Sequence, residues 1–281
     1  MEKEICDKFA TICHYTKYDT VKKILKNKNI RATYYKELND SSEVEYAKNI
    51  IIDYLEKNPP HLCGKLIEDD YRSVVGDVYI TSFTKNNTEL GLIENDGILS
   101  MWRYYGKDGG CCIEFGTNKI FESYKKHIHL DQTMPQALVF DEVLYNTKNY
   151  KNKISLKLRA FYDALVKKNL NNVFLNDYAN KFTELLCLLK YQAFFEENEI
   201  RAVLYLNPPN HPKTQNSIQS KCPTHEYIEV FFDVSSISKI IVGPQNNQKV
   251  KIDDLKKYLN QEGYNNIEVA CSEIPFKNLL K

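Results

Sequence analysis

Short strand-like runs that lead directly into helical stretches constrain this 281-residue chain more than any other feature. Ala10–Tyr15 favours a strand, and Val21, Ile24 and Leu25 follow it at helical spacing, with Thr16 or Asp19 as the expected helix cap. A second such pair follows at 30–35 and 44–55, where Ser42 and Glu45 fit a capping box. The pattern therefore predicts a mixed α+β fold.

The second half of the chain continues this alternation and adds a helical stretch. Two long helical patterns, 154–170 and 177–194, predict a helical insertion at about 150–194 within a single α+β domain of residues 1–281. The strand-like segments are expected at 78–83, 111–115, 139–145, 200–205, 227–232, 239–242 and 267–271.

The composition limits the classes of protein to which this chain can belong. Thirty-eight basic and thirty-seven acidic residues leave a net charge of +1, which argues against bulk electrostatic binding of long nucleic acid but leaves room for a local basic groove. The charged N-terminus lacks a secretion signal, and the apolar run Leu185–Leu189 is too short to span a bilayer. We therefore expect a cytoplasmic protein without membrane contact.

The eight cysteines show no Cys-x-x-Cys pair. His61-x-Cys63 and His127-x-His129 each offer two metal ligands but no second pair at a recognisable spacing. We therefore expect reduced thiols, no disulfide and no bound metal, with Cys111 and Cys112 on opposite faces of a strand.

Three groups of residues are candidates for a site. His14, with Tyr15 and Thr16, lies at a strand end before a helix N-terminus, a place suited to ligand hydroxyls and phosphates. A structural histidine is the alternative interpretation of His14. Glu199 and Arg201 alternate onto one face of a strand. A solvated acidic turn with a supporting Glu199–Arg201 pair is the alternative there.

The third group combines Ser82 at a strand end with Trp102 and Arg103. A hydroxyl there can bind an amide or ribose, and an aromatic ring beside a guanidinium can hold a planar base or a phosphate. Core packing explains Trp102 equally well. Gly109 and Gly110 lack the spacing of a dinucleotide or phosphate loop.

Taken in order, several motifs resemble the bacterial domain-of-unknown-function family 2971. The motifs are His14-Tyr15-Thr16, the run from Ile30 to Glu43, Ser82-Phe83, Trp102 to Gly106, Glu196 to Arg201, and Ile240 to Pro244. They span nearly the whole chain. The chain departs from the family pattern just before Gly109 and Gly110, where it has Lys107-Asp108.

The order of these elements is also similar to that of ADP-ribosyltransferase-like folds, which implies a split two-sheet core. The resemblance implies that Glu199 is the catalytic carboxylate and that His14 holds the ribose and amide side of NAD. Tyr15, Thr16, Arg31, Ser82, Trp102, Arg103 and Arg201 would complete the cofactor site. NAD or a related nucleotide would be the substrate, and nucleic acid would enter only as an acceptor.

Three functions follow as hypotheses. The leading one is an NAD-consuming ADP-ribosyltransferase or NAD glycohydrolase, of the kind found in toxins or antiphage effectors. The second is a non-catalytic ligand-binding or protein-interaction domain on the same scaffold. The third is a metal-independent nuclease or phosphodiesterase that uses His14 with a carboxylate. His14, Ser82 and Glu199 should converge on one cleft if the first is correct.

Overall fold

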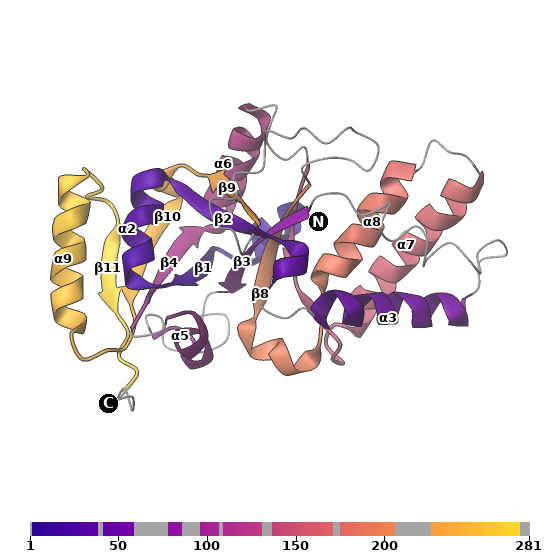
Figure 1. Ribbon diagram of the computed structural model, residues 1–281, viewed down its shortest axis with the longest axis horizontal. Helices are drawn as coiled ribbons and strands as arrows, with labels where there is room; N and C mark the ends of the chain where they lie inside the picture. Colours follow the sequence, from indigo (N-terminus) through magenta and orange to yellow (C-terminus); the bar gives the residue numbers. More distant parts are fainter. Residues whose placement is uncertain are drawn as a thin grey trace.

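The computed structural model describes residues 2–38, 42–58, 78–85, 96–106, 109–130, 137–170, 175–205 and 226–275. Helices and strands alternate along them (Figure 1). The helices are α1 (Glu2–Lys8), α2 (Tyr18–Asn27), η1 (Tyr35–Glu37), α3 (Ser42–Lys57), α5 (Leu99–Tyr105), α6 (Thr117–Leu130), α7 (Lys151–Leu170), α8 (Leu175–Leu188), η4 (Gln192–Glu197), η5 (Val234–Ser236) and α9 (Gln248–Gln261). The strands are β1 (Thr11–Thr16), β2 (Asn29–Tyr34), β3 (Val78–Lys85), β4 (Cys111–Gly116), β5 (Ala137–Glu142), β6 (Leu144–Tyr145), β7 (Leu189–Lys190), β8 (Glu199–Tyr205), β9 (Tyr227–Phe231), β10 (Ile237–Val242) and β11 (Glu268–Cys271).

The fold is mixed α+β, as the sequence predicted. Among the described residues, a nine-stranded mixed sheet runs in the order β11-β10-β4-β1-β3-β2-β9, with β8 paired to β3 and β5 paired to β8. Only β10 and β11 are parallel neighbours within it. A separate two-stranded sheet joins β6 and β7. The split two-sheet core that the resemblance implies is not shown, because the main strands form one large sheet that forks.

The fork lies at β3. β8 pairs along β3 from Val78 to Thr84 and so occupies one edge of that strand. The other edge is shared, because β1 pairs at Thr84 and Lys85 whereas β2 pairs at Tyr79 and Ile80. Residues 81–83 therefore face the gap where β1 and β2 diverge. A gap of this kind inside a sheet leaves backbone groups available for other partners.

Helix α2 follows β1 as predicted, and Val21, Ile24 and Leu25 are buried in the main core. Its cap differs from the prediction, because Lys17 is the N-cap residue and makes no side-chain capping bond. The helix ends at Lys28, whose φ of 54° is left-handed. This residue turns the chain back into β2.

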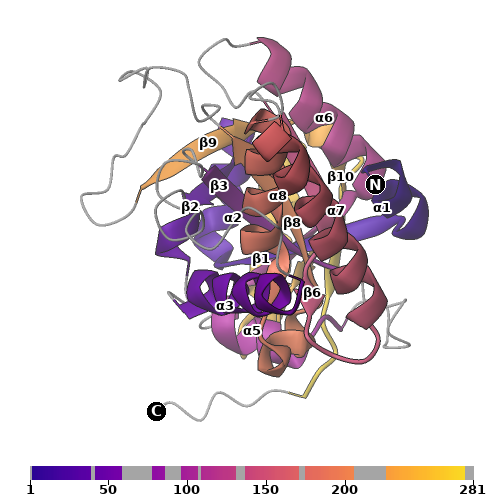
Figure 2. The ribbon, with the colours of Figure 1, turned by 90° about the vertical axis from the view of Figure 1, so that its right-hand side faces the viewer.

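The helical insertion has its own core, built by α7 and α8 together with α3 (Figure 2). Phe161, Tyr178 and Phe182 stack at its centre. The second predicted helix, 177–194, is shorter than expected, since α8 ends at Leu188 and the chain enters β7 and η4. That early end places Lys190 beside the start of β8.

The cysteines agree with the strand prediction. Cys111 belongs to the main core and Cys112 to a smaller core around Trp102, on the other face of β4. Among the described residues, Cys13, Cys111, Cys112, Cys187 and Cys271 are free thiols. Cys63, Cys222 and His61 lie outside the described ranges. No helix of the described residues is long and apolar enough to cross a bilayer.

Candidate functional site

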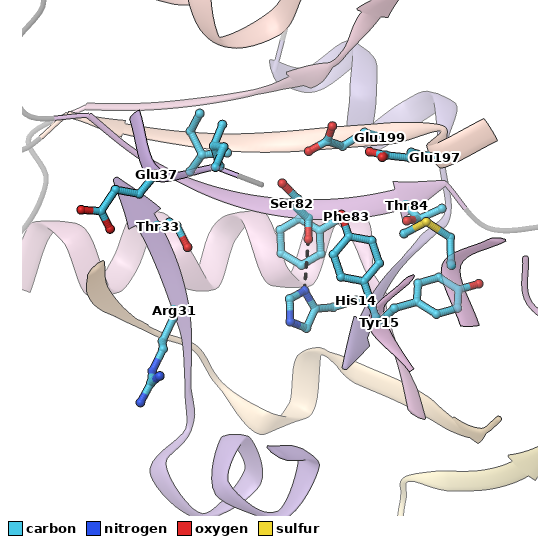
Figure 3. Close-up of a pocket in the computed structure, with 14 residues that line it drawn as sticks. His14, Tyr15, Arg31, Thr33, Glu37, Ser82, Phe83, Thr84, Glu197 and Glu199 are labelled. Carbon is cyan, nitrogen blue, oxygen red and sulfur yellow. Dashed lines mark hydrogen bonds between the residues drawn. The ribbon is translucent and has the colours of Figure 1, made fainter. Parts of the chain in front are cut away.

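A cleft opens at the fork of the sheet. Its inner pocket, of about 170 Å³, is lined from β1, β2, β3, β8, α5 and η4 (Figure 3). A wider outer hollow of about 840 Å³ continues from it toward α2 and α5. The two spaces share one set of lining residues, namely Tyr15, Leu38, Ser82, Tyr105, Glu197 and Glu199. They therefore form one continuous cleft.

His14, Ser82 and Glu199 all line the inner pocket. The Nδ1 atom of His14 lies 3.1 Å from the backbone carbonyl oxygen of Ser82, and the Ser82 side chain is one of the groups that lower the pKa of Glu199. Figure 3 shows Ser82 between the other two residues. The predicted convergence of these three residues on one cleft is confirmed, and their roles in chemistry stay predictions.

The carbonyl partner fixes the state of His14. A carbonyl oxygen can only accept, so Nδ1 carries the proton and Nε2 keeps its lone pair. Burial lowers the pKa of His14, and the hydrogen bond to Ser82 offsets this only in part. His14 is therefore neutral at pH 7 and presents an acceptor nitrogen on the wall of the inner pocket.

Glu199 belongs to a buried group of charges that we name the cleft cluster. Its five members are Glu43, Lys190, Glu197, Glu199 and Arg201, which come from α3, β7, η4 and β8. Arg201 contacts the two Glu199 carboxylate oxygens at 2.7 and 2.9 Å, and Lys190 lies 3.2 Å from one of them. Glu43 pairs with Arg201 at 2.7 Å and with Lys190 at 2.8 Å.

These contacts set the charge of Glu199. Burial would raise the pKa of this carboxyl, but Arg201, Lys190 and the hydroxyl of Ser82 together lower it to about 2. Glu199 is therefore ionised at pH 7. The neighbouring Glu197 behaves differently, because burial raises its pKa despite a 2.7 Å contact with Lys190. The two carboxylates at the cleft thus differ in their affinity for a proton.

Glu199 and Arg201 hold one another in the wall of the cleft. Glu199 is 4% exposed and contacts two buried cations, Lys190 and Arg201, so it contributes to the fold. Arg201 lines the outer hollow, and its guanidinium bonds Glu199, Glu43 and the carbonyl of Cys187. Its role as a cofactor contact stays a prediction. The alternative interpretation, a supporting Glu199–Arg201 pair, describes this geometry.

Three other predicted residues reach the cleft. Tyr15 lines both spaces, and its hydroxyl accepts a hydrogen bond from the backbone N–H of Ile98. Thr16 lines the outer hollow. Arg31 lines the inner pocket, where its guanidinium lies 4.1 Å from the centre of the Tyr227 ring.

Trp102 and Arg103 do not line the cleft, contrary to prediction. Trp102 is 5% exposed, its Nε1 donates to the carbonyl of Asp96, and its ring packs so closely against Gly97 and Gly243 that a Cβ atom on either glycine would overlap it. Core packing therefore explains this motif. Arg103 is exposed and lines neither the inner pocket nor the outer hollow.

Sequence reasoning missed the partners that hold Glu199. Glu43 appeared only as the end of the run that resembles the family, and Lys190 was assigned to a continuing helix. Neither lies near Glu199 in a recognisable motif, so no local signal could have found them. Glu197 had a weaker signal, because it belongs to the same acidic run, 196–199, as Glu199.

Metal ligands do not gather in the described part of the chain. No group of three or more His, Cys, Asp or Glu side chains there is arranged to hold a metal ion.

Comparison with known proteins gives one match. Residues 101–202 match the model of a family described as protein of unknown function DUF2971. That segment is a little over a third of the chain and includes the whole cleft cluster except Glu43, but neither His14 nor Ser82. No curated protein and no solved structure matches the chain.

Proposed function

We propose that this chain cleaves the bond between nicotinamide and ribose in NAD, acting as an ADP-ribosyltransferase or NAD glycohydrolase. The observation that supports the proposal most strongly is that neutral His14, Ser82 and ionised Glu199 line one pocket at the fork of the sheet, where the Ser82 carbonyl oxygen holds the His14 ring. It places one acceptor nitrogen and one carboxylate on a single cleft beside aromatic side chains.

The chemistry needs one carboxylate. Nicotinamide leaves NAD as a neutral base, so no acid is required to protonate it, unlike the leaving alkoxide in glycoside hydrolysis. As the C–N bond breaks, positive charge develops on the ribose. Glu199 is fixed and ionised, so it stabilises this charge and accepts a hydrogen bond from a ribose hydroxyl. Water, or a nucleophile of an acceptor, then bonds to the anomeric carbon and loses a proton.

The remaining cleft residues position the dinucleotide. The Nε2 atom of His14 accepts a hydrogen bond from a second ribose hydroxyl or from the carboxamide. The inner pocket has room for one planar ring, and the outer hollow accommodates the rest of the ligand or an acceptor. Arg31 supplies a guanidinium for a phosphate at the inner end.

Release of nicotinamide from NAD tests the proposal. We expect the purified chain to release it, and His14→Gln to reduce the rate by about tenfold to a hundredfold because Gln positions the ribose less well. His127→Gln is the matched control, since His127 lies on α6 and contacts Asp233 rather than the cleft. An absence of release by the wild type, with and without protein or nucleic acid acceptors, would exclude this activity.

One observation favours the non-catalytic alternative. Both Glu199 oxygens already accept hydrogen bonds from Arg201, which is the arrangement of a structural ion pair. A binding domain on this scaffold would bind NAD, as measured by calorimetry, without releasing nicotinamide. The same two measurements therefore separate the two functions.

A toxin or defence effector of this type should act on cells. If the chain consumes NAD, its unregulated expression in a bacterium should lower cellular NAD and arrest growth. Expression of His14→Gln at the same level should do neither. Growth arrest without NAD loss would point to another activity.

A further inference from the structure

The segment from Lys17 to Lys36 concentrates positive charge. It contains seven basic residues and one acidic residue, a net charge of +6, whereas the whole chain has +1. Most of this charge lies on α2 and its two ends. The near-neutral total of the chain therefore conceals a basic region on one side of the molecule.

Four lysines of this segment, Lys17, Lys23, Lys26 and Lys28, are exposed. We name them the α2 lysine band. Among the described residues, no carboxylate lies within ion-pair distance of any of the four. Lys22, by contrast, is neutralised by Asp254 of α9 at 2.6 Å. The band spans the ten residues of α2, about 15 Å, which is longer than a single phosphate group requires.

One end of the band reaches the cleft. Lys17 and Thr20 line the outer hollow, together with Tyr104 of α5. Tyr104 is 70% exposed, the most exposed large aromatic side chain in the described residues. A path of positive charge along α2 therefore ends beside an uncovered flat ring at the mouth of the cleft. Figure 1 shows α2 and α5 adjacent at this side of the sheet.

We infer that the α2 lysine band binds the phosphodiester backbone of single-stranded nucleic acid, with one unpaired base stacked on Tyr104. Lysines placed along a helix contact successive phosphates without reading sequence. An exposed aromatic ring stacks on a base of any identity. An acidic protein would satisfy the lysines but would leave Tyr104 unused, and a duplex would keep its bases inside the stack. This binding does not depend on NAD consumption.

Binding of a fluorescently labelled single-stranded oligonucleotide, followed by anisotropy at several salt concentrations, tests the inference. With four phosphates neutralised, the logarithm of the association constant should fall with the logarithm of salt with a slope of about −3, at roughly 0.7 per phosphate. Lys23→Glu/Lys26→Glu should weaken binding at least tenfold and reduce the slope to about half, because two of the four contacts are reversed.

The matched control is Lys249→Glu/Lys256→Glu on α9. These two lysines are exposed and lie seven residues apart on one face of the helix. Both lysines are roughly 140° to 160° around the helix axis from Asp254, which contacts α2. The control changes the net charge by the same amount and should retain most of the affinity. Equal losses in the two double variants, or equal affinities of the wild type and Lys23→Glu/Lys26→Glu, would overturn the inference.

Tyr104 separates single-stranded binding from binding of any polyanion. Tyr104→Ala should lower affinity for the single strand roughly tenfold without changing the salt slope, whereas Tyr104→Phe should keep the affinity. A duplex of the same sequence should bind more weakly than the single strand. Equal affinity for the duplex and no effect of Tyr104→Ala would overturn the assignment of a single strand. Thermal melting of each variant confirms that it is folded.

Discussion

Two buried groups of charges lie at the same strand ends but on opposite faces of the sheet. The first is the cleft cluster around Glu199. In the second, Glu142 accepts hydrogen bonds from Lys8, Lys85 and Lys153 at 2.7 to 2.8 Å; we name these four residues the closed cluster. Glu142 is opposite Ile200, the residue that follows Glu199, so the two carboxylates point to different sides of β8.

The pKa values alone do not separate the two clusters. Burial would raise the pKa of Glu142, but its three lysines lower it to about 2, the same value as for Glu199. The two clusters differ instead in whether a cavity reaches the carboxylate. Glu142 lines neither the inner pocket nor the outer hollow, because α1, β3 and α7 bring their lysines over it. A perturbed carboxyl therefore indicates a site only where a cavity reaches it.

The largest effect should come from Glu199→Gln. Gln cannot neutralise Arg201 and Lys190, so the free energy of unfolding should fall by about 3 to 5 kcal/mol. NAD turnover per folded molecule should fall about a hundred- to thousandfold, the usual result of removing one fixed electrostatic contact. Urea unfolding and nicotinamide release measure the two quantities. Turnover close to that of the wild type in the folded fraction would remove Glu199 from catalysis.

Glu142→Gln is the matched variant in the closed cluster. The free energy of unfolding should fall by about 3 kcal/mol, because Lys85 is buried and loses its carboxylate. Lys8 and Lys153 are partly exposed and regain water, so the loss should be smaller than for Glu199→Gln. Turnover per folded molecule should not change. A large loss of turnover would mean that the two clusters are coupled, and the comparison would fail.

Acid should destabilise both clusters in the same pH range. Each carboxyl has an ordinary pKa of 4.5 and a folded pKa of about 2. Because the folded value is the lower one, the stabilisation is present above pH 4.5 and is lost as pH falls toward 2. Each group should account for roughly 3 kcal/mol of that loss. Urea unfolding from pH 7 to pH 2.5 should show a smaller decline in Glu142→Gln than in the wild type.

The smallest effect is expected from Ser82→Ala, which removes a hydroxyl that helps to lower the pKa of Glu199 but leaves the carbonyl that bonds His14. Turnover should fall about tenfold, and the free energy of unfolding should change by about 1 kcal/mol. Ser123→Ala is the control, because the Ser123 hydroxyl accepts a hydrogen bond from the backbone of Asp233, away from the cleft. Equal losses of turnover in both variants would show that Ser82 acts only through stability.

Local patterns in the sequence predicted the strands and the residues at their ends. The runs at 10–15, 78–83 and 200–205 are β1, β3 and β8 to within two residues, and they place His14, Ser82 and Glu199. Helix α6 was not predicted, because its apolar residues Ile120, Phe121 and Tyr124 follow a strand without a break. Helix α1 was also missed, since Ile5 is the one deeply buried side chain among residues 5–8, the part of this helix whose side chains are described.

The environment of each site residue could not be predicted from local patterns. Glu43 and Arg201 are separated by 158 positions in the chain, and Lys8 and Glu142 by 134. Pairs of this kind depend on the topology of the sheet. Trp102 shows the same limit, because Gly243, one of the two glycines that receive its ring, comes from a distant segment of the chain. Residue type therefore suggested a ligand contact where packing was the reason.

Because the sheet forks at β3, the length of this strand sets the width of the cleft. β1 pairs with this strand at Thr84 and β2 at Ile80, so four residue steps separate the two walls, about 13 Å at 3.3 Å per residue. The separation between His14 on β1 and Arg31 on β2 is thus set by the length of β3 rather than by the loops around the cleft. A chain of this design could accept a larger ligand by lengthening β3 by two residues, which would widen the opening by about 7 Å and keep every side chain on its original face.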